Sequence, residues 1–141
     1  MKDVFRVEFL SKAENEGFAR ACVATFMARL NPTIDEINDV KTAVSEAVTN
    51  SVVHGYKDDK GLIDMEVSIE DNILSIVIND YGIGIDNVEQ AREPLFTTKP
   101  EEERSGMGFT FMEIFMDSLK VDSEKGKGTT VHMSKKILGG K

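Results

Sequence analysis

The chain has 141 residues, a mass of 15.6 kDa and a formal net charge of -8 at pH 7. This length suits one domain with a single core, and the acidic balance argues against broad binding to nucleic acid or to an anionic membrane surface. A single cysteine excludes an intramolecular disulfide, and no apolar run approaches the roughly 18 residues of a membrane span. The start of the chain lacks the long apolar stretch of a signal peptide, so we expect a cytoplasmic protein.

In chain order, the pattern first predicts a strand and a helix. Hydrophobic and polar residues alternate over 3–10, which is typical of a strand. Ser11 and Glu14 have the spacing of a capping box and predict a helix that ends before Pro32.

A second helix is expected to start at Thr33, which has capping-box spacing with Glu36. It should run for about 20 residues and end at Gly55, which suits a left-handed C-cap. Two strands then follow over 63–69 and 73–78, joined by a two-residue hairpin turn at 71–72.

Residues 81–107 lose all periodicity and form an unusually long connection for a compact domain. A helix over 109–117 and strands around 118–123 and 129–136 complete the chain. These elements predict an α+β two-layer sandwich with a mixed β-sheet and helices packed on one face. With no internal repeat in the sequence, we expect one domain over 1–141.

Three short patterns are candidates for chemistry. Glu46 and Asn50 lie four residues apart on the second helix, so their side chains project from one face as a candidate base and metal ligand, or merely as a solvated face. Asp80 ends the most hydrophobic strand, where a carboxylate is costly unless it is hydrogen-bonded. Gly82 and Gly84 follow it and allow the backbone to approach a flat ligand closely.

The third pattern is the glycine turn Ser105-Gly106-Met107-Gly108, which precedes the third helix. Backbone amides at such a helix entry can cradle phosphate, although a flexible helix entry explains the same glycines. A late strand carries Thr129 and Thr130.

The order of these patterns resembles the Bergerat-fold ATPases, the superfamily that includes type II topoisomerases and the ATP domains of histidine kinases. The resemblance covers about residues 33–134. Segments 46–56 and 95–100 and the Asp80 box are further similar to the anti-sigma factor serine kinases, and to the sporulation members in particular. That resemblance implies a homodimer that holds a sigma factor inactive. It also implies phosphorylation of a serine on an anti-anti-sigma protein with ATP and Mg²⁺.

The resemblance also implies a role for each matching residue. Asp80 would bind the adenine amino group with support from Thr130, and Gly82 and Gly84 would shape the base pocket. Asn50 would coordinate Mg²⁺, and Glu46 would be the general base that deprotonates the attacking serine. A mobile lid at about 86–107 would close over the phosphates. Its expected ATP-binding residues are Thr98, Lys99, Arg104, Ser105, Gly106 and Met107, with Gly108 at its end.

A partner surface is expected on the first helix. Glu16, Arg20, Ala24 and Met27 should lie opposite its apolar stripe, and Arg20 is the predicted contact for one or both partner proteins. The alternative is an ordinary solvated face with a Glu16–Arg20 ion pair.

Three rival functions remain open from the sequence. One is a general-stress anti-sigma kinase, which shares the same motifs. Another is a stand-alone histidine-kinase-like ATP domain, although neither His54 nor His132 is placed as a phosphoacceptor on a dimerisation helix. The last is a nucleotide-gated binding module without transfer activity.

Overall fold

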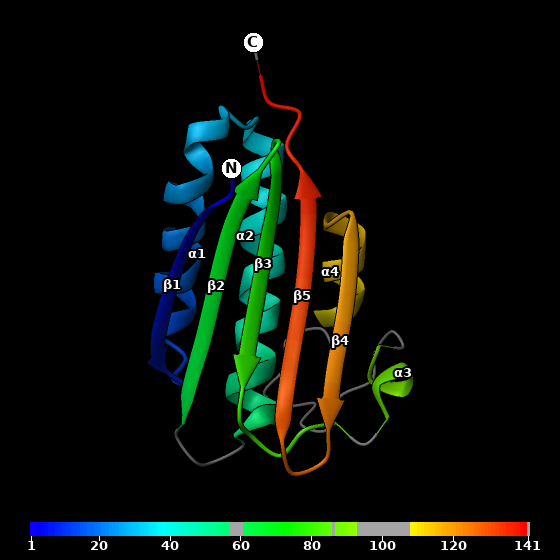
Figure 1. Ribbon diagram of the computed structural model, residues 1–141. Coiled ribbons are helices and arrows are strands. Elements are labelled where there is room, and N and C mark those ends of the chain that lie inside the picture. Colours follow the sequence, from blue (N-terminus) through cyan, green and yellow to red (C-terminus); the bar gives the residue numbers. More distant parts are fainter. Residues whose placement is uncertain (57–60, 86, 93–107, 141) are drawn as a thin grey trace.

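The computed structural model describes residues 1–56, 61–85, 87–92 and 108–140 (Figure 1). Its helices and strands, in chain order, are β1 (Asp3–Leu10), α1 (Asn15–Met27), the 3-10 turn η1 (Ala28–Leu30), α2 (Ile34–Asn50), the π-helical turn η2 (Ser51–Gly55), β2 (Leu62–Glu70), β3 (Ile73–Asp80), α3 (Val88–Ala91), α4 (Gly108–Phe115), β4 (Ser118–Glu124) and β5 (Gly128–Lys136). Within these described residues, no helix has the length and apolar character needed to cross a membrane.

The strands form one five-stranded sheet in the order β1-β2-β3-β5-β4, and α1, α2 and α4 cover one of its faces (Figure 1). The α+β two-layer class is therefore confirmed. The expected mixture of parallel and antiparallel pairs is wrong for the described strands, since every pairing among them is antiparallel. The reason is that β5 inserts between β3 and β4, which would have been parallel neighbours after a helical crossover.

The predicted turn between β2 and β3 is confirmed, because Asp71 and Asn72 both have positive φ, at 52° and 64°, as a tight two-residue hairpin requires.

Alternation along the strands separates a core face from an open face. The core face packs against the helices. The core includes these buried side chains: Val23, Val40, Val44, Val48, Ile63, Met65, Val67, Leu74, Ile76, Ile78, Met112, Val131 and Met133.

One of the two expected capping boxes is wrong and the other is confirmed. Ser11 is buried and accepts a 2.9 Å hydrogen bond from the Gly61 amide, so it anchors the end of β1 to the start of β2, and α1 begins later at Asn15. By contrast, the Thr33 hydroxyl accepts from the Glu36 amide and the Glu36 carboxylate accepts from the Thr33 amide.

The end of α2 also differs from the expectation. Gly55 does not adopt a left-handed conformation; instead the helix widens into η2, and the Tyr56 amide bonds the Ser51 carbonyl five residues back. Such π-turns are often found at functional sites. The absence of a side chain at Gly55 serves packing, because a Cβ there would lie 3.0 Å from the Asp80 carboxylate.

Candidate nucleotide site

A buried carboxylate defines one end of the sheet. Asp80, the last residue of β3, is only 3% exposed. Its Oδ2 accepts a 2.9 Å hydrogen bond from the Ser51 hydroxyl, and its Oδ1 accepts a 3.0 Å bond from the Gly82 amide. Burial raises the pKa of Asp80, and hydrogen bonds from Gly82, Ser51 and the Thr129 amide oppose that rise. The carboxylate is thus held in place without a cationic partner among these contacts.

Glycines allow the segments around Asp80 to pack backbone against backbone. A Cβ at Gly82 would lie 1.9 Å from the Gly55 carbonyl oxygen, which accepts a 2.8 Å hydrogen bond from the Ile83 amide. Gly84 has φ of 76°, and a Cβ there would lie 2.1 Å from the Glu124 carbonyl oxygen. Any larger residue at Gly82 or Gly84 would therefore push the loop after Asp80 away from η2 and β4.

The second polar pair lies on the same helix. Glu46 and Asn50 occupy adjacent turns of α2, and both face the first residue of α4. A Cβ on Gly108 would lie 3.2 Å from Glu46 Oε2 and 3.3 Å from both polar atoms of the Asn50 amide. The polar face predicted from the i, i+4 spacing is therefore real, and it meets a helix N-terminus instead of bulk solvent.

These features fit a nucleotide and a magnesium ion. The Asn50 Nδ2 atom is buried and has no hydrogen-bond partner among the described residues, so this N–H donor is available to an acceptor on a ligand, such as a phosphate oxygen. The described residues contain no cluster of three or more His, Cys, Asp or Glu side chains suited to a metal. Mg²⁺ at nucleotide sites is usually held by one or two protein oxygens together with phosphates and water, and the Asn50 side chain carries one oxygen of this kind.

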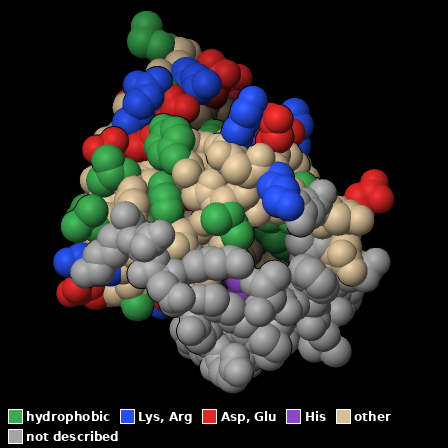
Figure 2. All heavy atoms as spheres, turned by 90° about the horizontal axis from the view of Figure 1, so that it is seen from below, with side chains coloured by type: hydrophobic (Ala, Val, Ile, Leu, Met, Phe, Trp, Pro, Cys, Tyr) green, Lys and Arg blue, Asp and Glu red, His purple; other side chains and the backbone are tan. Residues whose placement is uncertain are grey.

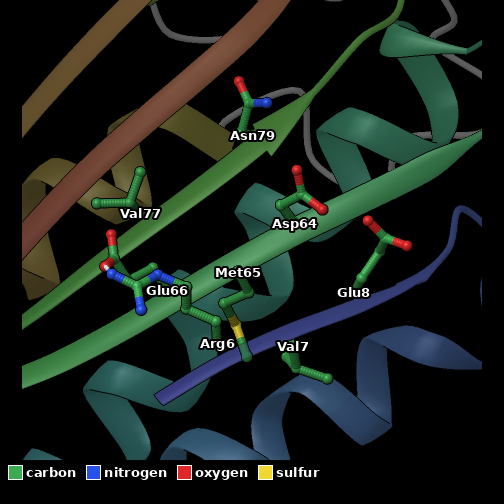
Figure 3. A pocket seen from close by; sticks show the side chains of 8 residues that line it. All are labelled: Arg6, Val7, Glu8, Asp64, Met65, Glu66, Val77 and Asn79. Atoms are coloured by element: carbon green, nitrogen blue, oxygen red, sulfur yellow. Dashed lines mark ion pairs between the residues drawn. The ribbon is translucent and has the colours of Figure 1, made fainter. Parts of the chain in front are cut away.

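The structure moves the supporting threonine by one position. Asp80 pairs with Thr129 across β3 and β5, and Thr129 is buried. Thr130 pairs with Asn79, and its hydroxyl donates to the Asn79 side chain. Asn79 lines a shallow depression on the open face of the sheet (Figure 3). The expected support of Asp80 by Thr130 is therefore wrong, because adjacent strand residues point to opposite faces.

Sequence reasoning missed several residues that shape this site. Strand register, had it been assigned, would have selected Thr129 as the residue opposite Asp80. Ser51 follows Asn50 directly, and no spacing rule marks it as the partner of Asp80. Gly128 was also missed: with φ of 96°, it lies so close to Asp80 that a Cβ would be 2.1 Å from the Asp80 carbonyl oxygen.

Part of the predicted site lies outside the described residues. These are the lid positions Thr98, Lys99, Arg104, Ser105, Gly106 and Met107. Their roles stay predictions, as does the boundary of the lid at 86–107, of which the structure describes 87–92, including α3.

Comparisons with known proteins show what this chain is similar to. A family model described as "Histidine kinase-like ATPase domain" matches residues 9–135. An anti-sigma F factor of Clostridium beijerinckii is 64% identical over 132 residues, which is 93% of this chain and 92% of that protein. An anti-sigma F factor of Geobacillus thermodenitrificans is 54% identical and covers 100% of this chain and 97% of its own. The chain belongs to the anti-sigma F factor family.

A solved structure extends the comparison at the level of the fold. The RsbU and RsbW domains of Rv1364c from Mycobacterium tuberculosis superpose with a TM-score of 0.69 at 17% identity. The match covers 96% of this chain and 32% of the Mycobacterium tuberculosis chain. The fold described above therefore also occurs as one part of a larger protein.

In this member of the anti-sigma F factor family, the expected partner surface on α1 is smaller than predicted. Met27 is fully buried, because α1 packs against both the sheet and α2 and so has a wider core face than its apolar stripe suggested. The expectation that Met27 contributes to an exposed partner surface is therefore wrong. Glu16 is 18% exposed, accepts a 3.3 Å hydrogen bond from the Thr49 hydroxyl on α2, and lies 3.6 Å from Arg20. Arg20 itself is 42% exposed.

Other apolar side chains are exposed on both sides of the sheet near the start of α1. Leu10 and Leu62 pair across β1 and β2, and the Phe18 ring contacts Phe9 edge-on. Leu10, Leu62 and Phe18 are all exposed. Figure 2, seen from below, shows hydrophobic side chains gathered on the β1 side of this end of the molecule.

Proposed function

We propose that this protein is an ATP-dependent serine kinase that binds and inhibits a sporulation sigma factor and phosphorylates an anti-anti-sigma protein. The observation that carries the proposal is the buried Asp80 carboxylate at the end of β3, held by Ser51 and Gly82, beside the helix α2 that presents Glu46 and Asn50. A recognition group for the base thus lies at the end of β3, and a polar pair for the metal and the serine hydroxyl lies on the neighbouring helix α2.

Each side chain has a separate task in this proposal. Asp80 accepts a hydrogen bond from the adenine amine, and Ser51, Gly82 and Thr129 hold the carboxylate for it. Asn50 contributes its amide oxygen to the Mg²⁺ site. Bound MgATP supplies the phosphoryl group and the metal charge that offsets the phosphates. Glu46 orients the serine hydroxyl and takes its proton.

The N-terminus of α4 supports the phosphate end of the site. The first amides of a helix have no partners within it, and the first residue of α4, Gly108, lies beside Glu46 and Asn50, so this helix end favours negative charge there. The proposed lid residues Lys99 and Arg104 would add positive charge, and the amides of Ser105, Gly106 and Met107 would extend the cradle. Phosphoryl transfer relies mainly on such positioning and charge neutralisation.

The rival functions make different demands on the site. A histidine-kinase-like domain needs a phosphoacceptor histidine, yet His132 lies on β5 near Asp122 and His54 lies within η2. A binding module without transfer needs no base facing the N-terminus of α4, where Glu46 lies. A general-stress anti-sigma kinase would use the same site chemistry and differ only in its partners.

An assay with γ-³²P-ATP and a purified anti-anti-sigma protein tests the proposal. We expect acid-stable label on the substrate protein, as phosphoserine has, and abolition of labelling when the acceptor serine is replaced with alanine. Acid-labile label on a histidine would support the histidine-kinase reading. Nucleotide binding without label on either protein would support the binding module.

The partner part of the proposal is tested separately. We propose that the protein is a cytoplasmic homodimer and that Arg20 contacts the sigma factor, the anti-anti-sigma protein or both. Arg20→Glu should weaken partner binding in a pull-down and leave ATP affinity unchanged, because Arg20 is partly exposed and forms its ion pair with Glu16 on the same helix. Unchanged affinity for both partners would place the shared surface elsewhere. Co-purification identifies the sigma factor, and sedimentation equilibrium tests the homodimer.

A further inference from the structure

The Tyr56 hydroxyl joins three segments around the end of β3. It donates a 2.6 Å hydrogen bond to the Leu62 carbonyl at the start of β2 and accepts a 2.8 Å bond from the Tyr81 amide. Tyr56 directly follows η2, whose Ser51 holds the Asp80 carboxylate, and Tyr81 directly follows Asp80. The Tyr56 hydroxyl therefore fixes the backbone that follows Asp80, while Ser51 of η2 fixes the Asp80 side chain.

The Tyr56 ring packs directly against the backbone at Gly61, just before β2. A Cβ on Gly61 would lie 2.2 Å from Tyr56 Cε1, so the ring occupies space that only a glycine leaves free. The Gly61 amide donates to Ser11, which fixes this stretch to β1. Burial raises the pKa of Tyr56, and the phenol keeps the proton that it donates to Leu62.

We propose that Tyr56 is a positioning residue for base selectivity, which it provides by holding the turn after Asp80 against η2. This inference rests on the proposed function, in which Asp80 receives the adenine amine. Without the phenol, the Tyr81 amide and the Leu62 carbonyl lose their shared partner, and the turn that carries the Gly82 amide is less constrained. A hydrogen bond between a fixed acceptor and a ligand amine is sensitive to displacements of about 0.5 Å.

The neighbouring tyrosine provides a matched control. The Tyr81 side chain is exposed, and its hydroxyl donates to Asp64, which points toward Glu8 on the open face of the sheet (Figure 3). Tyr81→Phe removes this side-chain bond but keeps the backbone amide that Tyr56 accepts from. It therefore removes one tyrosine hydroxyl from the same turn without removing the proposed constraint.

The test compares two nucleotides in the full chain. Dissociation constants are measured for MgATP and for the magnesium complex of purine riboside triphosphate, which lacks the 6-amino group. In wild type, ATP should bind more tightly. Tyr56→Phe should weaken ATP binding about 5- to 10-fold and change binding of the analogue by less than about 2-fold. The dissociation constant of the analogue divided by that of MgATP should therefore fall toward one. Gly61→Ala, which displaces the ring, should lower the ratio in the same way, and Tyr81→Phe should leave it unchanged.

Other outcomes overturn the inference in distinguishable ways. If Tyr56→Phe weakens both nucleotides equally, or changes neither, Tyr56 has no selective role, and the wild-type preference for ATP still supports Asp80 as the adenine acceptor. If wild type itself shows no preference, the adenine assignment fails and the inference fails with it. If Tyr56→Phe does not fold, Gly61→Ala carries the same test, since an unchanged ratio there would contradict the proposal.

Discussion

Opposite ends of the molecule hold a carboxylate against backbone amides, with opposite consequences for its pKa. Asp80 is buried at the end of β3, and burial raises its pKa despite the bonds from Gly82 and Ser51. Glu36 lies at the start of α2, near the C-terminus (Figure 1). Desolvation alone would raise its pKa, but amide hydrogen bonds from Thr33, Leu138 and Gly139 outweigh it, and the pKa of Glu36 is lowered.

Glu36 stabilises the fold, whereas we propose that Asp80 binds a ligand. Glu36 Oε1 accepts from the Thr33 and Gly139 amides, at 2.9 and 3.1 Å, and Oε2 accepts from the Leu138 amide at 2.8 Å. Its negative charge is fully used inside the chain. Burial makes the charge of Asp80 unfavourable for the fold itself. Ionisable groups held in such unfavourable surroundings are often found at functional sites, in agreement with a role in binding the adenine amine.

The largest expected effect comes from replacing Asp80. Asp80→Asn places a donor where the adenine amine needs an acceptor, and a mismatch of about 1–3 kcal/mol corresponds to a loss of roughly 5- to 150-fold in ATP affinity. The variant removes a buried charge but also one of the two oxygens that accept from Ser51 and Gly82, so these opposing effects should leave it folded with only a small change in unfolding temperature. Titration calorimetry and thermal unfolding measure the two effects. ATP binding as tight as that of wild type would contradict the assignment.

The pH dependence of ATP binding should show the raised pKa. As the pH falls through the folded-state pKa of Asp80, which lies above its ordinary value of 3.8, the carboxylate gains a proton and loses an acceptor. ATP affinity should then fall while the protein remains folded. The Asp80→Asn variant is the control, since it lacks this titration. Identical pH profiles for wild type and variant would remove Asp80 from the recognition of the base.

At the other end, Glu36→Gln should affect stability and leave the nucleotide alone. Loss of the charged acceptor should lower the free energy of unfolding by about 1 kcal/mol at neutral pH. The sign follows from the lowered pKa: the stabilisation is present above the ordinary value of 4.5 and is lost as the pH falls through the lower folded-state value. Denaturant unfolding at pH 7 and near pH 3 should therefore show the difference shrinking with acid. A weaker ATP affinity in this variant would contradict the prediction that Glu36 has no role in nucleotide binding.

The smallest effect concerns the two threonines of β5. Thr129→Ala should weaken ATP binding a few-fold, because Thr129 lies beside Asp80 and its hydroxyl bonds Ser123, whose hydroxyl also accepts from the Ile85 amide. Thr130→Ala should leave ATP binding unchanged, since its hydroxyl bonds Asn79 on the open face. The reverse pattern would restore the expectation from the sequence.

Much of the fold could be predicted because its signals are local. The alternation in β1 and β2, the Asp71-Asn72 turn and the Thr33–Glu36 capping box each depend on neighbouring residues. The failures have non-local causes. The buried position of Met27 depends on how α1 packs on α2, and the antiparallel sheet depends on where β5 inserts.

The same distinction applies to the site. Glu46 and Asn50 follow from helical spacing, and Asp80 follows from the cost of a carboxylate at a buried strand end. Ser51 and Gly55 could not be found this way, because their roles come from contacts with Asp80 across 29 and 25 positions of the chain. The π-turn that places both residues against β3 has no recognised signature in the sequence.

The most direct test of the central claim is a single-turnover phosphorylation assay with Glu46→Gln. The account predicts that this variant binds MgATP as wild type does and transfers phosphate to the serine of an anti-anti-sigma protein roughly 100-fold or more slowly. Asn50→Ala, measured alongside, should instead weaken the Mg²⁺-dependent part of nucleotide binding. Transfer by Glu46→Gln at the wild-type rate, with saturating MgATP, would contradict the claim that this site is a serine kinase with Glu46 as its base.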